Sequence, residues 1–126
     1  MQFEGDIIVA DSQNNRIQVF DRNGKRGEED DDGLFNEPFG VVVDRQGNCA
    51  VTDSGNNRVQ IFNPAGQFVR KYGSEGKENG QMNEPTGVGL LSNGNIVVAE
   101  LWGNRLQIFD PQGNFVRIGG LGQWPD

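Results

Sequence analysis

The chain has 126 residues and a mass of 13.9 kDa, which fits one compact domain. Its formal charge of −7 repels phosphate backbones and disfavours nucleic acid as a partner. The only cysteine, Cys49, excludes an intrachain disulfide, and its place in a strand pattern predicts a small buried apolar residue.

The sequence contains no pattern for a membrane span or an exported precursor. No run of about 18 apolar residues occurs, and the first residues lack the basic start and apolar stretch of a signal peptide. We therefore expect a soluble, cytoplasmic protein that has no membrane partner. The 19 glycines favour frequent turns and short strands over long helices.

Three copies of one motif organise the chain. Gly5–Phe20 and Gly47–Phe62 share nine of sixteen positions, and Gly94–Phe109 is a looser copy. A second repeated unit, Asn-Glu-Pro-X-Gly, stands at residues 36–40 and 83–87. The spacing grows from 42 to 47 residues because the loop before the third copy carries an insertion. The chain is therefore a repeat protein.

Each repeat predicts short antiparallel strands. The inner strands, Gly40–Asp44 and Gly87–Leu91, are apolar runs that we expect to be buried on both faces. Tight glycine turns join them to second strands, and the third strands alternate with a period of two. The second strands are Asp6–Ala10, Asn48–Thr52 and Asn95–Ala99; the third are Arg16–Phe20, Arg58–Phe62 and Arg105–Phe109; the outer are Gln67–Tyr72 and Asn114–Gly119.

Four antiparallel strands in each period of 40-odd residues indicate the blade of a β-propeller. The fold class is therefore all-β, with one domain of three blades. Blade 1 covers about residues 1–35, blade 2 residues 36–82 and blade 3 residues 83–126. The inner strand of blade 1 is largely missing. In blade 1 the outer strand is poorly defined, because residues 25–32 are all charged except Gly27.

An acidic residue and an arginine stand five positions apart in every motif, on either side of a tight turn. We expect half-buried ion pairs with hydrogen bonds to the turn, because a hairpin brings the two residues together. Their repetition favours a structural role over metal ligation or general-base catalysis. We therefore predict no catalytic residue, metal site or cofactor. The pairs are Asp11 with Arg16, Asp53 with Arg58, and Glu100 with Arg105.

The pattern Pro-X-Gly-Val…Gly-Asn-Ile-X-Val-Ala-Asp-X-X-Asn-Asn-Arg-Ile-Gln-Val-Phe resembles the NHL repeat over almost the whole chain. Residues 6–20 match it closely, and residues 100–104 depart from it at the turn. The resemblance implies a six-bladed propeller, as in the C-terminal domains of tripartite-motif proteins that bind proteins or RNA. Some enzymatic propellers use histidine-bound zinc or a calcium-binding acidic cluster. This chain has no histidine and no unique inward-facing acidic set, so we expect no enzyme.

Three blades do not close a ring, since propellers have four to eight blades. Two chains related by a two-fold axis would supply six. The residues around Trp124 and Pro125 match Glu37-Pro38-Phe39, so the chain stops where a further inner strand would begin. We therefore expect a homodimer whose interface includes Met1, Phe3, Trp124 and Pro125. The alternatives are a piece of a longer propeller and an engineered half-propeller without a ligand.

The favoured function is a self-assembling propeller module whose loop-lined face binds a protein or peptide. Trp102 is the candidate partner-binding residue, because it stands in a turn that is polar in the other copies; covering a neighbouring blade is an equal alternative. RNA binding, by resemblance to some NHL domains, is a further alternative that the net charge opposes. We interpret the acidic run Glu28–Asp32 as a solvated loop.

Overall fold

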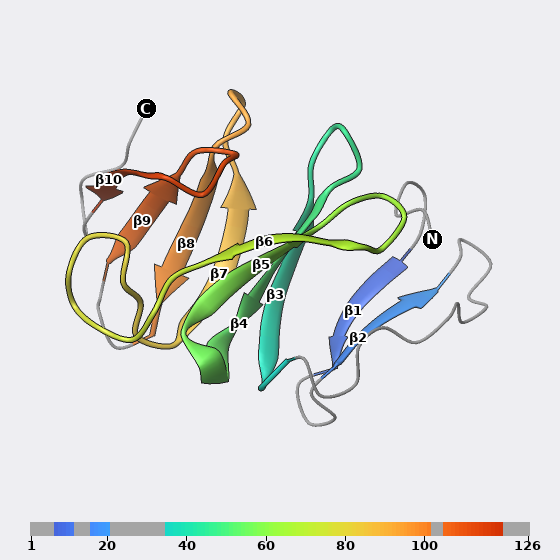
Figure 1. Ribbon diagram of the computed structural model, residues 1–126, viewed down its shortest axis with the longest axis horizontal. Coiled ribbons are helices and arrows are strands. Elements are labelled where there is room, and N and C mark those ends of the chain that lie inside the picture. The colour runs from blue at the N-terminus through green and yellow to red at the C-terminus, as the bar shows by residue number, and fades with distance from the viewer. Residues whose placement is uncertain (1–6, 12–15, 21–34, 102–104, 120–126) are drawn as a thin grey trace.

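The computed structural model describes residues 7–11, 16–20, 35–101 and 105–119, the first two ranges by their backbone (Figure 1). These residues form ten short antiparallel strands and one 3-10 turn, which confirms the all-β class. None of the described residues belongs to a helix of the length and hydropathy needed to cross a bilayer.

The strands form two four-stranded sheets and one hairpin. Blade 2 is a sheet in chain order, β3-β4-β5-β6, and blade 3 is β7-β8-β9-β10. Both sheets were predicted, with boundaries that agree to within about two residues. The strands are β1 (Ile7–Asp11), β2 (Arg16–Phe20), β3 (Pro38–Val43), β4 (Cys49–Asp53), β5 (Arg58–Phe62), β6 (Phe68–Tyr72), β7 (Pro85–Leu90), β8 (Ile96–Glu100), β9 (Leu106–Phe109) and β10 (Phe115–Gly119).

Glycine turns at one end of the sheets join the inner strands to the second strands. Gly47 and Gly94 have φ of 87° and 92°, a region that glycine enters without steric cost. Each donates its N–H to the carbonyl three residues back, from Gly47 to Asp44 and from Gly94 to Leu91, at 3.0 Å. These turns and the 3-10 turn Ser54–Asn56 lie at opposite ends of the sheets (Figure 1).

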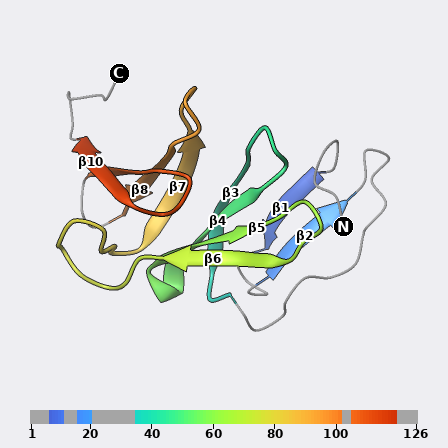
Figure 2. The same cartoon turned by 45° about the horizontal axis from the view of Figure 1, so that its top comes forward.

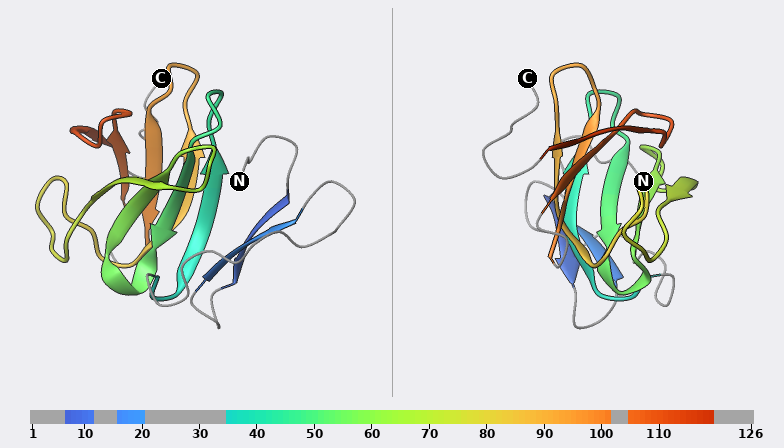
Figure 3. Two further views of the ribbon diagram at one scale, coloured as in Figure 1. Left: turned by 45° about the vertical axis from the view of Figure 1, so that its right-hand side comes forward. Right: turned by 90° about the vertical axis from the view of Figure 1, so that its left-hand side faces the viewer.

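The two sheets and the hairpin stand side by side, with β3 between β7 and β1 (Figures 2 and 3). The sheets therefore fan out from a line of adjacent strands, as blades do around a propeller axis. The structure in this way confirms propeller-like blades, while the side chains of the β1–β2 hairpin lie outside what it describes.

The main core fills the space between blades 2 and 3. Val59 and Val98 are fully buried there, and the rings of Tyr72 and Phe109 pack at a tilt of 40° with their centroids 4.8 Å apart. Burial of such apolar surface stabilises by about 25 cal/mol per Å². The buried members are Ala50, Val59, Ile61, Met82, Ile96, Val98 and Phe109.

A second core covers the opposite face of blade 2. It consists of Phe35, Cys49, Val51 and Phe62, all at most 5% exposed. Cys49 is 1% exposed, which confirms the prediction of a buried, strand-borne thiol. Because strand side chains alternate between faces, β4 and β5 contribute to both cores, and blade 2 is packed on both sides.

The prediction that the inner strands are buried on both faces is wrong. Most residues of β3 and β7 are only half-buried, and Phe39 is 61% exposed, whereas all of β4 is buried. The reason is their place in the sheet. β3 and β7 are edge strands with one hydrogen-bonded neighbour each, while β4 and β5 lie between two strands.

Thr52 joins blade 2 to blade 3 by hydrogen bonds. Its hydroxyl donates to the carbonyl of Thr86 at 2.6 Å and accepts the N–H of Gly40 at 2.7 Å. A β-carbon at Gly40 would lie 2.6 Å from that same carbonyl, so glycine permits the close approach. Ser54 also donates its hydroxyl to the carbonyl of Pro85.

Candidate functional site

The repeated motif forms a compact reversal at the end of blade 2. Asp53 ends β4, the 3-10 turn Ser54–Asn56 follows, and Arg58 begins β5. Asn57, with φ of 54°, provides the left-handed residue that asparagine tolerates better than most side chains. The Cα atoms of Asp53 and Arg58 are register partners, so the acid and the arginine face each other.

The Asp53 carboxylate is fully enclosed and uses both oxygens. Oδ1 accepts the N–H of Asn36 at 2.7 Å. Oδ2 accepts Nε of Arg58 at 2.7 Å, Nδ2 of Asn56 at 3.0 Å and Nε2 of Gln60 at 3.1 Å. The side chain is 0% exposed, whereas that of Arg58 is 22% exposed. We expected both partners to be half-buried, but the carboxylate is fully buried and only the arginine is partly exposed.

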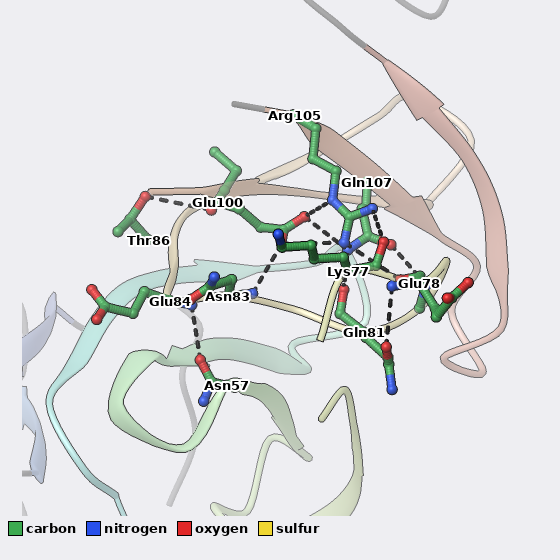
Figure 4. A network of polar contacts seen from close by, with 12 residues as sticks. Asn57, Lys77, Glu78, Gln81, Asn83, Glu84, Thr86, Glu100, Arg105 and Gln107 are labelled. Carbon is green, nitrogen blue, oxygen red and sulfur yellow. Dashed lines mark hydrogen bonds and ion pairs between the residues drawn. The ribbon is translucent and has the colours of Figure 1, made fainter. Parts of the chain in front are cut away.

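Glu100 forms the same arrangement in blade 3 (Figure 4). Its Oε1 accepts the N–H of Asn83 at 2.9 Å, and Oε2 accepts Nε of Arg105 at 2.5 Å and Nε2 of Gln107 at 2.9 Å. The carboxylate is again 0% exposed and the arginine 15%. Each acid thus links its second and third strands to the segment that enters its inner strand.

Arg105 and Gln107 also hold the loop at residues 77–81, which lies in the inserted segment. Arg105 donates to the carbonyls of Lys77 and Gln81, both at 3.0 Å, and Gln107 donates to Gln81 at 2.5 Å (Figure 4). The N–H of Gly80 returns a bond to Oε1 of Gln107 at 2.8 Å. The insertion is therefore docked on blade 3. Sequence reasoning missed this role, since carbonyl acceptors leave no signal in residue types.

The geometry of these acids leaves no reactive oxygen. Both carboxylates are shielded from water and accept hydrogen bonds on both oxygens, so contact with a substrate or a cation would require the turn to open. Among the described residues, no group of three or more His, Cys, Asp or Glu side chains could hold a metal ion.

The remaining predicted residues are only partly placed. The Cα atoms of Asp11 and Arg16 are register partners in the β1–β2 hairpin, as in the other two motifs. Their side chains lie outside the described part of the chain. Five further predicted residues and the acidic run at 28–32 also lie outside the described residues; the five are Met1, Phe3, Trp102, Trp124 and Pro125.

A cleft opens between blades 2 and 3 at the end opposite the motif turns. Its volume is about 550 Å³, within the range of small-ligand sites. Apolar side chains, including Val42, Ile61 and Leu90, form its floor, and the two glycine turns form its rim. Arg45 and Arg70 lie at this rim. Sequence reasoning missed the cleft because its walls come from two different repeats.

The outward face of blade 3 is a second concave apolar surface. A cavity of about 340 Å³ lies on it, lined by residues of β7, β8 and β9. Val97, Ala99 and Leu106 are only half-buried there, and a β-carbon at Gly89 would meet no atom within 4 Å. We call this surface, defined by Gly87, Gly89, Val97, Ala99 and Leu106, the open face of blade 3.

Comparison with known proteins gives a family and a fold. The family model for the NHL repeat matches residues 4–20, 35–62 and 82–109, more than half of the chain. The comparison with curated proteins found no match.

Among solved structures, a streptogramin B lyase is 20% identical with a TM-score of 0.75, and the match covers 98% of this chain and 38% of that one. Virginiamycin B lyase from Staphylococcus aureus is 18% identical with a TM-score of 0.73, covering 96% of this chain and 38% of that one. A nidogen/laminin complex contributes a chain that is 17% identical with a TM-score of 0.72, covering 93% of this chain and 43% of that one. The chain therefore spans less than half the length of these neighbours.

Proposed function

Because the chain belongs to the NHL repeat family, we propose that it is a non-enzymatic β-propeller module that closes its ring with a second copy. In the resulting six-bladed ring, the face lined by loops binds a protein or peptide. Ring closure and partner binding are each supported by one surface of the molecule, and the non-enzymatic part is supported by the two buried motif acids.

The observation that carries ring closure is the open face of blade 3. The corresponding face of blade 2 is made of equivalent residues, with Ala50 in the place of Val97 and Val59 in the place of Leu106. Blade 3 covers that face of blade 2 and buries it. The equivalent apolar face of blade 3 has no covering blade within the described residues. A further blade would bury it in the same way.

The sequence of blade 1 fits that role. The covering face of blade 3 presents Ile96 and Val98, which correspond to Ile7 and Val9 in the motif alignment. Blade 1 of a second copy would therefore bring aliphatic residues to the open face, and the two-fold axis would repeat the contact at the other junction. The coverage of 38% to 43% in the solved neighbours supports a ring larger than one chain.

Two exposed apolar side chains support partner binding at the end that carries the motif turns. Phe39 is 61% exposed beside Pro38, whose Cα is the register partner of Asp53. Leu101 is 52% exposed directly after Glu100. Apolar and aromatic side chains exposed at this end of the sheets fit the centre of a protein-binding surface. Trp102, the next residue in the chain, adds an aromatic side chain to this sequence.

The non-enzymatic part of the proposal is supported by the burial and hydrogen bonding of the Asp53 and Glu100 carboxylates. A solved variant of virginiamycin B lyase, described as catalytically inactive and bound to quinupristin, has alanine in place of one histidine. None of the 126 residues of this chain is a histidine, so the chain resembles the lyase in fold but lacks that side chain.

Size-exclusion chromatography with light scattering on matched variants tests ring closure. Leu106→Asp places a charge on the open face and should convert dimers into monomers that keep their β-sheet circular dichroism. Ala65→Asp adds the same charge to an exposed turn of blade 2 and should leave the dimer intact. Equal masses for both variants would contradict the proposal.

Partner binding is tested separately. The intact protein should capture peptides from a peptide library. Phe39→Ser or Trp102→Ala should reduce this capture, whereas Phe68→Ser should not. Phe68 is exposed to a similar extent, 52%, but lies on the outer strand of blade 2. Equal capture by all variants would contradict binding at the loop-lined face.

A further inference from the structure

We propose that the cleft between blades 2 and 3 is a binding site for a carboxylate attached to an apolar group. The ligand class includes aliphatic carboxylic acids and the free C-terminus of a peptide with an aliphatic last residue. Both walls of the cleft belong to one chain, so the site does not depend on ring closure or on the proposed partner-binding face.

The floor of the cleft provides for the apolar part of the ligand. Val42 and Ile61 enter it from blade 2, and Leu90 and Ile96 from blade 3. All four belong to the core between the blades or pack against it, so the floor is fixed by the packing of both sheets. An aliphatic chain resting there would exchange water for apolar contacts at about 25 cal/mol per Å² of buried surface.

The rim of the cleft carries the side chains that would bind the carboxylate. Arg70 is half-buried, and its Nη1 donates to the carbonyl of Pro111 at 3.2 Å, which is its one hydrogen bond within the described residues. That bond holds the guanidinium across the gap between the blades and leaves further N–H groups for a ligand. A planar guanidinium matches a carboxylate with two parallel hydrogen bonds. Arg45, exposed on the glycine turn of blade 2, adds a second positive charge.

The charge of the rim opposes that of the whole molecule. The protein has a formal charge of −7, but the charged residues that line the cleft are Arg45, Arg70 and Asp44. Oδ1 of Asp44 already accepts the N–H groups of Gln46 and Asn48, at 2.9 and 2.8 Å, because it closes its own turn. The local balance is therefore positive, which draws an anion to this place on an otherwise acidic surface.

The control for a change in charge has to lie outside every cleft between neighbouring blades. Arg117 in β10 holds the position of Arg70 in β6, each next to the central isoleucine of the third strand, Ile108 or Ile61. In the six-bladed ring proposed above, blade 1 of a second copy would face Arg117, so Arg117 is not a control of this kind. Lys71, the exposed residue next to Arg70 in β6, is not among the residues that line the cleft and serves as the matched control for a change in charge.

Calorimetric titration of the intact protein with two pairs of probes tests the proposal. Octanoate should bind saturably, and octylamine, with the same chain and the opposite charge, should not. N-acetyl-leucine should bind and its amide should not if peptide C-termini are ligands; binding of octanoate alone would assign the site to aliphatic acids.

Variants locate the binding. Arg70→Met keeps the aliphatic part of the side chain but removes its charge. It should weaken the affinity for octanoate by about tenfold or more, which is the usual contribution of a hydrogen bond to a charged group. Ser92→Asp adds a negative charge to the exposed turn of blade 3 at the rim, without touching Arg70, and should weaken it as well. Lys71→Met also removes one positive charge from β6 and should bind octanoate within about twofold of the original protein, as a change outside the cleft would. Equal binding of octanoate and octylamine, or unchanged binding in both Arg70→Met and Ser92→Asp, would overturn the proposal.

Discussion

Blades 2 and 3 have the same strands in the same order, yet they differ in what surrounds them. Blade 2 is packed on both faces, and its third strand is buried from Val59 to Phe62. Blade 3 is packed against blade 2 on one face and leaves Val97, Ala99 and Leu106 partly exposed on the other. The difference teaches that a blade of this sequence type stays apolar on both faces whether or not a neighbour is present, as expected of a unit made for stacking.

The largest expected difference between the blades comes from a charge at equivalent positions of the third strand. Val59→Asp would bury an unpaired carboxylate at a site that is 0% exposed, and should cost more than about 4 kcal/mol of the free energy of unfolding. Leu106→Asp should cost less than about 1 kcal/mol in a single chain, since the carboxylate reaches water. Urea unfolding followed by circular dichroism, under conditions that keep both variants monomeric, measures the two costs. Similar costs would show that the face of blade 3 is covered.

The buried acids come next. Removal of Asp53 or Glu100 by substitution with alanine leaves an arginine and a backbone N–H without their acceptor, and each should cost about 3–5 kcal/mol. The Glu100 variant should have an additional effect, because Arg105 also holds the loop at residues 77–81. Limited proteolysis should cut that loop faster in Glu100→Ala than in Asp53→Ala. Equal rates of cleavage would mean that the loop is held by Gln107 alone.

The hydroxyl of Thr52 gives a smaller effect. Thr52→Val removes the bond to the carbonyl of Thr86 and leaves the N–H of Gly40 without an acceptor, at a cost of about 1–3 kcal/mol. Ala99 is the equivalent residue of blade 3, so the reverse change, Ala99→Thr, should alter stability by less than about 0.5 kcal/mol in the monomer. Thermal unfolding of the two variants compares them. A neutral Thr52→Val would assign the blade junction to apolar packing alone.

The smallest expected change in stability at neutral pH concerns Tyr72 of blade 2. The equivalent residue of blade 3 is Gly119. The Tyr72 hydroxyl is buried without a hydrogen-bond partner, so Tyr72→Phe should be neutral or slightly stabilising at pH 7. Burial raises the pKa of Tyr72 far above its ordinary value near 10. The folded state therefore keeps a proton that the unfolded chain loses, and stability should fall as the pH rises above about 10.

The alkaline loss of stability has a direct readout. Tyr72 is the only tyrosine, so the tyrosinate absorbance reports on it alone. Tyr72→Phe should lose less stability than the original protein between pH 9 and about 11, near the ordinary tyrosine pKa. An identical pH profile in both proteins, or ionisation of Tyr72 near pH 10 without unfolding, would show that the hydroxyl reaches water.

The strand pattern was predictable because the repeats supply their own alignment. Three copies of Gly…Asp/Glu…Asn-Arg at one spacing fix the second and third strands, and the structure places Asp53 opposite Arg58 and Glu100 opposite Arg105. The exposure of the inner strands was not predictable from their apolar composition. It depends on their position at the edge of each sheet, which the local sequence does not encode.

The parts of the candidate sites that sequence missed arise between repeats. The docking of residues 77–81 relies on backbone carbonyls as acceptors for Arg105 and Gln107. The cleft joins Arg70 of blade 2 to Leu90 and Pro111 of blade 3. Such features follow from the spacing of two sheets in space, and a motif read along one chain does not report that spacing.

The central claim is that the open face of blade 3 is covered by a second copy, and the mass of the unaltered protein in solution tests it most directly. Sedimentation velocity at micromolar concentration should give one species of twice 13.9 kDa. That species should persist at high salt, because the interface is apolar. A single species of 13.9 kDa at the same concentration would contradict the account.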